Sequence, residues 1–363
     1  MQFSLNAEDT LLVDSVRGQF QELFPFSAVQ QFADQLEIED ARHEVAADIG
    51  IYGVCAGESA GGLDLGALEA LLVTLEAGRN LVPLPVSEMI AATAALSQSH
   101  VDLTGQLIKG RLSATVTWYD CVVATQTSDG WSLSGLLDAV PWAAQSDYLL
   151  LPARPSQDGC ARDAFLVRLD DPSVELISNR GLDLTCPVAR VRINSLLVRE
   201  SDRLSGAATR LRNLVAICCA AEMLGAAERA FEMTVAYLKV RRQFGQVIGS
   251  FQSLKHIAAN DMASIESMRV AIQYAGWALD TAADDAEMAV AIAMSFISGS
   301  ARTVIENCIQ LHGGIAYTWK FGLHLFYRRI LRCAVTAGSV ELHREAIASL
   351  LIDSVIDSGY SEG

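Results

Sequence analysis

Several features that mark common classes of functional site are missing from this chain of 363 residues. Its eight cysteines include no C-x-x-C pair, and neither they nor the six histidines form a cluster, so we expect buried reduced thiols, no disulfide framework and no metal site. No run of 18 apolar residues is free of charge, and the first residues lack a basic segment followed by an apolar one. We therefore expect neither a membrane helix nor a signal peptide, which favours the cytoplasm.

Positive charge is also scarce. The chain has 27 Lys and Arg against 43 Asp and Glu, a formal charge of −16, which argues against nucleic acid or an anionic membrane as a partner. Hydrophobic residues make up 51% of the sequence, so we expect extensive burial and an oligomer that covers a second face of the most apolar helices. The length allows two or three domains.

Helical spacing of apolar residues dominates both ends of the chain. Near the N-terminus it predicts helices over 7–24, 29–36, 40–49 and 67–78, with a glycine-rich loop over 53–66 and with Pro83 and Pro85 as breaks. Toward the C-terminus it predicts long helices over 207–240, 254–282 and 285–309. A short connection should make the first two of these antiparallel, as in a bundle.

The residue pattern changes between about 111 and 199, where short runs of Val, Leu, Thr and Trp alternate with turn residues. The runs cover 114–118, 131–134, 148–151, 164–169 and 189–193, and the turns fall at 129–130, 158–159 and 170–172. This pattern predicts a small antiparallel β domain. The whole chain is then α+β, with an N-terminal helical domain (1–110), a middle β domain (111–203) and a C-terminal helical domain (204–363).

The connection between the first two long C-terminal helices, RRQFGQVIGSFQ from Arg241 to Gln252, holds the first set of candidate binding residues. The guanidinium of Arg241 can hold a phosphate bidentately, and Gln243 and Phe244 can complete the contact with a dinucleotide. Arg242 either adds positive potential or is simply solvated. The alternative for the whole stretch is a solvated arginine pair with a Phe that plugs the hairpin.

A second segment, QLHGGIAY from Gln310 to Tyr317, follows the next helix. Its glycine pair would end that helix or let a ligand approach the backbone closely. Together the two segments resemble the C-terminal helical domain of the acyl-CoA dehydrogenases, and the α, β, α order of domains is also that of this family. The residues that carry the resemblance are Arg241, Phe244, Gly245, Phe251, Gln252, Gln310, Gly313, Gly314, Tyr327 and Arg328.

In that family a glutamate removes the α-proton of an acyl-CoA while the β-hydride passes to FAD, and two backbone positions are known to supply the glutamate. The resemblance places these positions at Ala337 and Val215, so it implies that the chain has no catalytic base. Three carboxylates inside the long helix are candidates for a displaced base, but their spacing suits a solvated face or pairs between helices better: Glu222, Glu228 and Glu232.

The β domain departs from the family as well. The T-E-P-x-A-G-S-D segment that contacts the flavin ring has no counterpart before Trp131, and the W-I-T segment aligns with 139–141. Trp142 is then either a core residue or a shifted stacking ring. The resemblance thus implies that one half of a flavin site is kept and the other half is lost.

The kept half implies specific roles. Arg241 would bind the diphosphate of FAD, Gln243 and Phe244 the adjoining ribityl or phosphate region, and Gln310 with the glycine pair Gly313 and Gly314 the adenosine side. Ser339 would donate to the cofactor or serve as a turn residue, and His312 would cap a helix.

The resulting interpretation is a subunit of a heteromeric (α2β2) acyl-CoA dehydrogenase, similar to the non-catalytic subunit known from actinobacterial steroid and lipid catabolism. A catalytic homologue would be its partner, an acyl-CoA the substrate and an electron-transfer flavoprotein the acceptor. Two alternatives stay open: a self-sufficient homo-oligomeric dehydrogenase with a displaced base, and an inactive scaffold that keeps the fold.

Overall fold

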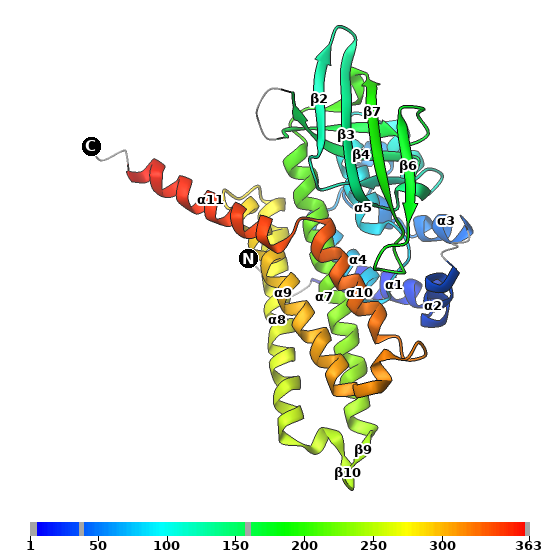
Figure 1. The fold of residues 1–363 in the computed structure, drawn as a ribbon, viewed down its shortest axis with the longest axis vertical. Helices are drawn as coiled ribbons and strands as arrows, with labels where there is room; N and C mark the ends of the chain where they lie inside the picture. Colours follow the sequence, from blue (N-terminus) through cyan, green and yellow to red (C-terminus); the bar gives the residue numbers. More distant parts are fainter. Residues whose placement is uncertain (1–5, 36–39, 157–160, 360–363) are drawn as a thin grey trace.

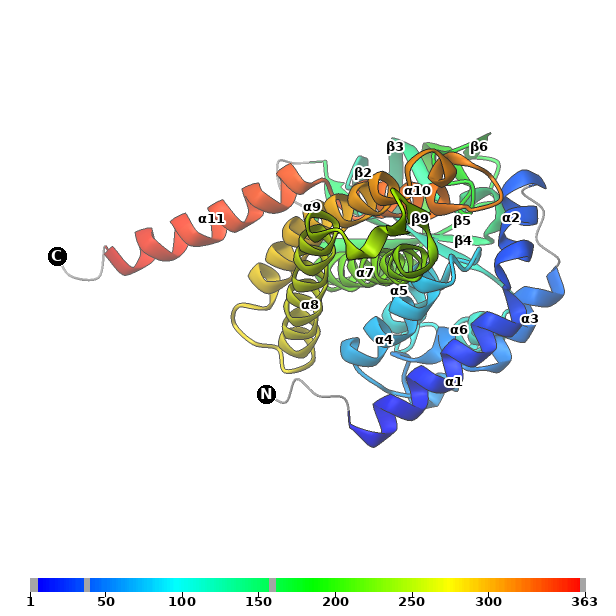
Figure 2. The same cartoon turned by 90° about the horizontal axis from the view of Figure 1, so that it is seen from below.

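The computed structural model describes residues 6–35, 40–156 and 161–359. Helices α1 to α6, a sheet and helices α7 to α11 follow one another along the chain, which confirms the predicted α+β class. Figure 1 shows the sheet above a bundle of long helices, with α11 extending away from the body. In Figure 2 the N-terminal helices lie to one side of α7, and α8 and α9 lie to the other. The domain boundaries at 110/111 and 203/204 stay a prediction.

The N-terminal helices match the prediction until the prolines. Asn6 caps the first helix: its side chain accepts from the Asp9 amide at 2.8 Å, and the Asp9 carboxylate accepts from the Asn6 amide at 3.2 Å. The glycine-rich loop contains two short 3-10 turns, Ile51–Gly53 and Glu58–Ala60. The predicted end of the second helix at Leu36 lies outside the described residues. The helices are α1 (Ala7–Leu23), α2 (Phe26–Gln35), α3 (Asp40–Asp48) and α4 (Ala67–Arg79).

Two further helices, α5 (Val86–Leu96) and α6 (Val101–Ile108), were not predicted. Pro85 is the residue before the first of them, where proline does not disturb a helix because the first amides have no intrahelical partner. A proline pair that looks like a break is therefore also a helix start.

The sheet has eight strands and is mainly antiparallel, as predicted, with two parallel pairings that the sequence did not predict. Two strands, β1 and β2, pair with β4 in parallel: Ala114 lies opposite Tyr148, and Val122 lies opposite Ala153. All other pairings in this sheet are antiparallel. The predicted turn at 158–159 lies outside the described residues. In the order β6-β7-β3-β2-β4-β5-β8, with β1 beside β4, the strands are β1 (Ala114–Val116), β2 (Val122–Thr127), β3 (Gly130–Pro141), β4 (Tyr148–Pro155), β5 (Asp163–Arg168), β6 (Val174–Asn179), β7 (Val188–Val198) and β8 (Arg203–Leu204).

The three long helices of the C-terminal part confirm the prediction. The longest crosses α4 at backbone contact, because a Cβ on Gly78 would lie 2.2 Å from the Glu222 carbonyl oxygen and one on Gly225 would lie 2.0 Å from that of Leu75. Asp280 then caps α4 from another helix by accepting from the Ala67 amide at 2.6 Å. The helices are α7 (Ala208–Val240), α8 (Gln252–Asp280), α9 (Ala286–His312), α10 (Leu323–Thr336) and α11 (Val340–Gly359).

Ala286–Tyr317 has the length and composition of a membrane span, but α9 packs against α7, α8, α10 and α11 as a core helix. The expected burial of the thiols holds for most cysteines and fails for Cys121, which is exposed. Cys55 is half-buried, and Cys160 lies outside the described residues. The buried free thiols are Cys186, Cys218, Cys219, Cys308 and Cys333.

Candidate functional site

The connection between α7 and α8 is a tight hairpin at one end of the bundle (Figure 1). Strands β9 (Arg242–Gln243) and β10 (Gln246–Val247) pair antiparallel around Phe244 and Gly245, whose φ angles are +51° and +80°. Two successive positive φ angles are those of a type I′ turn, and a non-glycine residue adopts the first at a cost of about 1–2 kcal/mol. The predicted short connection is therefore a strained two-stranded hairpin.

Phe244 does not plug this hairpin. Its side chain is 91% exposed and makes one edge-on ring contact, with Phe251 at a centroid distance of 6.2 Å. The plugging alternative is therefore wrong. A large aromatic side chain that is both exposed and held in a strained turn is typical of a contact for a ligand or a partner.

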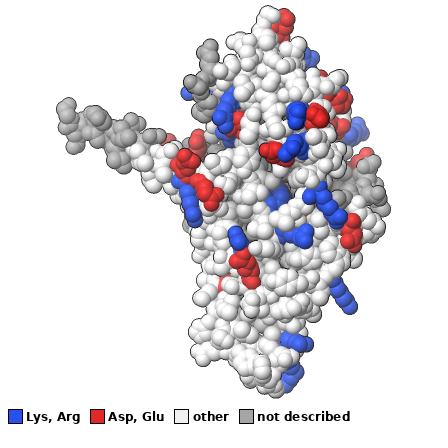
Figure 3. Space-filling model, in the orientation of Figure 1, with Lys and Arg blue, Asp and Glu red and all other residues white. Residues whose placement is uncertain are grey.

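The hairpin end is the positive part of an acidic chain. No Asp or Glu occurs from 233 to 260, while four cations do, and none of the four has an ion pair in the part of the chain that the structure describes. On the face drawn in Figure 3, the lower end shows Lys and Arg without Asp or Glu. Such an end favours an anionic ligand. The four cations are Lys239, Arg241, Arg242 and Lys255.

The second motif lies on the last turn of α9 and just after it. Gln310 is exposed, and Gly313 ends the helix at a φ of +65° before a 3-10 turn over Gly313–Tyr317. A Cβ placed on Gly313 or Gly314 would meet no heavy atom within 4 Å. The backbone of the glycine pair is thus open to close approach by a ligand.

A small hydrophobic cluster joins the two motifs. Leu238 and Ile248, which flank the hairpin, pack with Leu311, which lies between Gln310 and His312. Residues assigned from two distant segments, 241–244 and 310–314, therefore lie at the same end of the molecule. Ser339 is not among them: it lies beyond the other end of α10, and its hydroxyl accepts from the Leu342 amide at 3.4 Å at the start of α11. This contact supports the turn role for Ser339.

The two positions assigned to a base are apolar and closed. Val215 is 4% exposed and Ala337 is fully buried, and both belong to the main hydrophobic core. The Trp118 ring lies over the residue that follows, Gly338, so closely that a Cβ there would be 2.9 Å from it. His343 donates from Nε2 to the Ala337 carbonyl at 2.8 Å.

The displaced-base candidates are all engaged in ion pairs. Glu228 pairs with Arg79 at 2.8 Å and with Arg269 at 2.6 Å, and Glu232 pairs with Arg79 at 2.7 Å, which confirms the predicted pairs between helices. Glu222 is 3% exposed, so it is not on a solvated face, and it pairs with Arg329 and Arg332 of α10 as the alternative of interhelical pairs predicted. Trp142 is 2% exposed and packs with Phe32 and Cys186, so it is a core residue.

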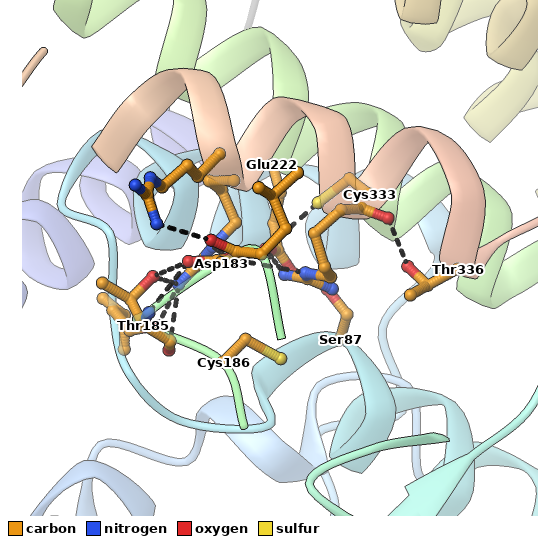
Figure 4. A network of polar contacts seen from close by, with 12 residues as sticks. Ser87, Asp183, Thr185, Cys186, Glu222, Cys333 and Thr336 are labelled. Atoms are coloured by element: carbon orange, nitrogen blue, oxygen red, sulfur yellow. Dashed lines mark hydrogen bonds and ion pairs between the residues drawn. The ribbon is translucent and has the colours of Figure 1, made fainter. Parts of the chain in front are cut away.

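Glu222 belongs to a buried ionic cluster that the sequence did not reveal (Figure 4). Arg329 lies at its centre: Nε contacts Asp183 at 2.7 Å, Nη1 contacts Glu222 at 3.0 Å, and Nη2 donates to the Thr185 hydroxyl at 2.7 Å. The Nη2 atom also donates to the Val82 carbonyl at 3.1 Å. The cluster thus ties α10 to α7, to the loop before β7 and to the segment before α5.

A second guanidinium, that of Arg332, contacts Glu222 at 2.8 Å and lies 3.8 Å from Glu88. Three buried carboxyl groups therefore face two buried cations. Burial raises the pKa of Asp183 and Glu222, but the two arginines more than offset it, so both pKa values fall below the ordinary range. Burial dominates at Glu88 and raises its pKa to about 7, which marks it as the carboxyl that takes up a proton.

Replacing Glu88 by Gln should remove a pH dependence of stability. The pKa of Glu88 is about 7 in the folded chain and 4.5 in the unfolded chain. The protonated carboxyl therefore contributes its full stability below pH 4.5, and this contribution is lost as the pH rises through 7. Glu88→Gln should therefore raise the free energy of unfolding by up to about 3 kcal/mol at pH 8 and by less than about 1 kcal/mol at pH 5. Urea unfolding at both pH values measures this, with the exposed Glu345→Gln as control. If the free energy of unfolding changed between pH 5 and pH 8 by the same amount in Glu88→Gln as in the parent, the pKa assigned to Glu88 would be contradicted.

The comparisons with known proteins agree with this fold. A model of the acyl-CoA dehydrogenase C-terminal domain matches residues 207–352. Acyl-CoA dehydrogenase FadE34 of Mycobacterium tuberculosis is 35% identical over 78% of this chain, which spans only 38% of FadE34. Acyl-CoA dehydrogenase IpdE2 of Mycolicibacterium smegmatis is 28% identical over 77% of this chain and 78% of its own length.

A solved structure shares the whole fold. The ChsE4–ChsE5 complex from Mycobacterium tuberculosis has a chain that superposes with a TM-score of 0.89 and 25% identity, over 97% of this chain and 99% of that one. The order of helices, sheet and helices, the matched C-terminal domain and these relatives lead to one conclusion: the chain belongs to the acyl-CoA dehydrogenase family.

Proposed function

We propose that this chain is a subunit of an FAD-dependent acyl-CoA dehydrogenase that helps to hold the FAD of a catalytic homologue and lacks a base of its own. One observation carries the proposal. Six candidate binding residues lie together at an open, positive end of the molecule, whereas both base positions are apolar and buried. We call the six residues the clamp: Arg241, Gln243, Phe244, Gln310, Gly313 and Gly314.

The clamp fits the non-reactive part of FAD. Arg241 is exposed without an acidic partner in the described residues, so its guanidinium is available to the diphosphate. The open backbone at the glycine pair and the exposed amide of Gln310 suit the adenosine side. When bound, FAD supplies the hydride acceptor for α,β-dehydrogenation of an acyl-CoA. In this proposal the chain binds and orients the cofactor and moves no proton.

The closure of this chain's own reaction centre supports the proposal. The Tyr119 hydroxyl donates to the Val335 carbonyl, and Arg212 holds Trp118 by donating to its carbonyl at 2.9 Å and by lying 5.4 Å from its ring centre. The segment after β1 is thereby fixed against the end of α10. The cleft of about 310 Å³ that is left between β3 and α10 has Ala139 where the family resemblance expects a tryptophan.

The surface around the clamp supports a partner. Val240, at the end of α7 before the hairpin, is 72% exposed, and Tyr317, at the end of the 3-10 turn after α9, is 75% exposed; such apolar exposure is typical of a surface that becomes covered on assembly. The ChsE4–ChsE5 complex shows that a chain of this fold assembles with a second component. In the proposed α2β2 complex, the partner supplies the base and the flavin-ring site, and the substrate is an acyl-CoA with a lipid or steroid side chain. Electrons pass to an electron-transfer flavoprotein in the cytoplasm.

Flavin content tests the proposal directly. We expect the chain to be colourless when purified alone and to carry about one FAD per pair of chains after co-expression with a catalytic homologue. Flavin absorbance per chain measures both. One FAD per chain in the isolated protein would instead support a self-sufficient homo-oligomer, and no flavin with any partner would support an inert scaffold.

A further inference from the structure

One buried ring lies between the two halves of the clamp. His312 is the last residue of α9 and precedes Gly313, and it is 5% exposed. Its ring stacks on Tyr237 of α7 at a centroid distance of 4.4 Å and an interplanar angle of 24°. Phe321 covers it at 4.6 Å. The ring therefore does more than cap a helix, which was the role expected from the sequence.

The stacked Tyr237 is linked to Arg241 by one turn of helix α7. The Tyr237 carbonyl accepts from the Arg241 amide at 2.9 Å, so Tyr237 sets the direction in which the backbone leaves α7. The chain then enters the hairpin, where the Ile248 amide donates to the Arg241 carbonyl at 2.8 Å. A shift of Tyr237 would thus move Arg241 relative to Gly313.

The hydrogen bonds of His312 fix its ring. Its Nδ1 lies 2.8 Å from the Cys308 carbonyl, which can only accept, so Nδ1 carries the proton. Nε2 is buried and has no hydrogen-bond partner among the described residues. Burial lowers the pKa of His312, which keeps the ring neutral among Tyr237 and Phe321. The Thr234 hydroxyl lies 3.5 Å from the same Nδ1, so hydrogen-bond contacts to two residues and two aromatic contacts fix the orientation of the neutral ring.

We infer that His312 is a positioning residue of the clamp: through its stack on Tyr237 it holds Arg241 and the glycine pair at the separation that FAD requires. The inference rests on the proposed function and adds a determinant of cofactor affinity that does not touch the cofactor. Leu238 and Leu311 lie on the same two helix ends and, with Ile248 from the 3-10 turn after the hairpin, supply the apolar support. His312 differs from these three residues because its ring contacts Tyr237 of α7 and its backbone leads directly into Gly313.

A double-mutant cycle tests the inference in the complex with the catalytic partner, with FAD as the probe. His312→Ala should weaken FAD binding about tenfold, because a binding site loses precision when the residues that support it no longer hold it in place. His312→Phe keeps the stack and should stay within about twofold of the parent. In the Arg241→Ala background, His312→Ala should add less than about twofold, because the residue acts through Arg241.

Two further variants decide between outcomes. Tyr237→Leu removes the same stack from the other side and should reproduce the effect of His312→Ala. The control His324→Ala removes a half-buried histidine that packs on Trp319 instead, and it should leave FAD affinity unchanged. An undiminished tenfold effect of His312→Ala in the Arg241→Ala background, or no effect of the single change, would overturn the inference. A parent complex without FAD, or an Arg241→Ala change without effect, would overturn the proposed function itself.

Discussion

Replacing Arg329 by Met is expected to lower the free energy of unfolding by about 3–5 kcal/mol, because it leaves Arg332 as the single cation facing the buried carboxyl groups of Asp183 and Glu222. Arg329 is 2% exposed and contacts Asp183, Glu222, Thr185 and the Val82 carbonyl. The side chain of Met fills a similar volume, so the loss is one of charge and hydrogen bonds rather than of packing. Urea unfolding of the purified chain at pH 7 measures the change.

The chain offers a matched control on the same helix. Arg328 is half-buried, and its guanidinium donates to the Leu182 carbonyl at 3.2 Å. Arg328→Met should lower the free energy of unfolding by no more than about 1 kcal/mol. Should Arg329→Met fail to fold, Thr185→Val removes one hydroxyl partner and should reduce stability by about 1–2 kcal/mol. Equal effects of the two arginine changes would show that the cluster does not hold the domains together.

This cluster also marks the limit of what the sequence predicts. Asp183, Glu222 and Arg329 come from three distant segments, and nothing in their spacing separates them from solvated charges. Glu222 occupies a helical position that suits a solvated face or a pair between helices, and its carboxylate is buried because Arg329 and Arg332 of α10 and Ser87 of α5 contact it. Burial of this kind depends on tertiary contacts, and local patterns carry no information about it.

The long helices were predictable for the opposite reason. The apolar residues of α7, α8 and α9 recur at helical spacing for several turns, so each helix is specified by its own sequence. The sheet was less predictable, since the parallel pairing of β1 and β2 with β4 depends on how the chain returns rather than on any strand alone. The hairpin lay between these cases: Phe244 and Gly245 form its turn, but a Phe at positive φ is not a turn signal.

The candidate site was predicted in part. The family pattern gathered the clamp residues, and the structure brings their two segments to one end through Leu238, Ile248 and Leu311. Ser339 lies away from them, beyond the other end of α10, where it accepts from an amide at the start of α11. The sequence could not decide this, because a serine after a glycine suits a helix start as well as a cofactor contact. The role of His312 was not visible, because ring stacking between helix ends leaves no spacing in the sequence.

Arg241→Ala is expected to weaken FAD binding by the complex about 10- to 100-fold, because a charge-assisted contact to a phosphate contributes about 1.5–3 kcal/mol. Arg241 is exposed and unpaired in the described part of the chain, so the variant should not disturb the fold. The free energy of unfolding should stay within about 0.5 kcal/mol of the parent. Fluorescence of FAD on dilution of the complex gives the affinity.

Two controls separate a direct phosphate contact from general attraction. Arg210→Ala removes an exposed arginine at the opposite end of α7 and should leave the affinity unchanged. Arg242→Ala removes the neighbouring cation and should weaken binding less than about threefold, as expected for a solvated charge that adds only potential. Added salt should likewise weaken binding more in the parent than in Arg241→Ala. Equal losses for Arg241→Ala and Arg242→Ala would mean that the hairpin attracts the cofactor without holding its diphosphate, and the clamp would then have to be assigned to other residues.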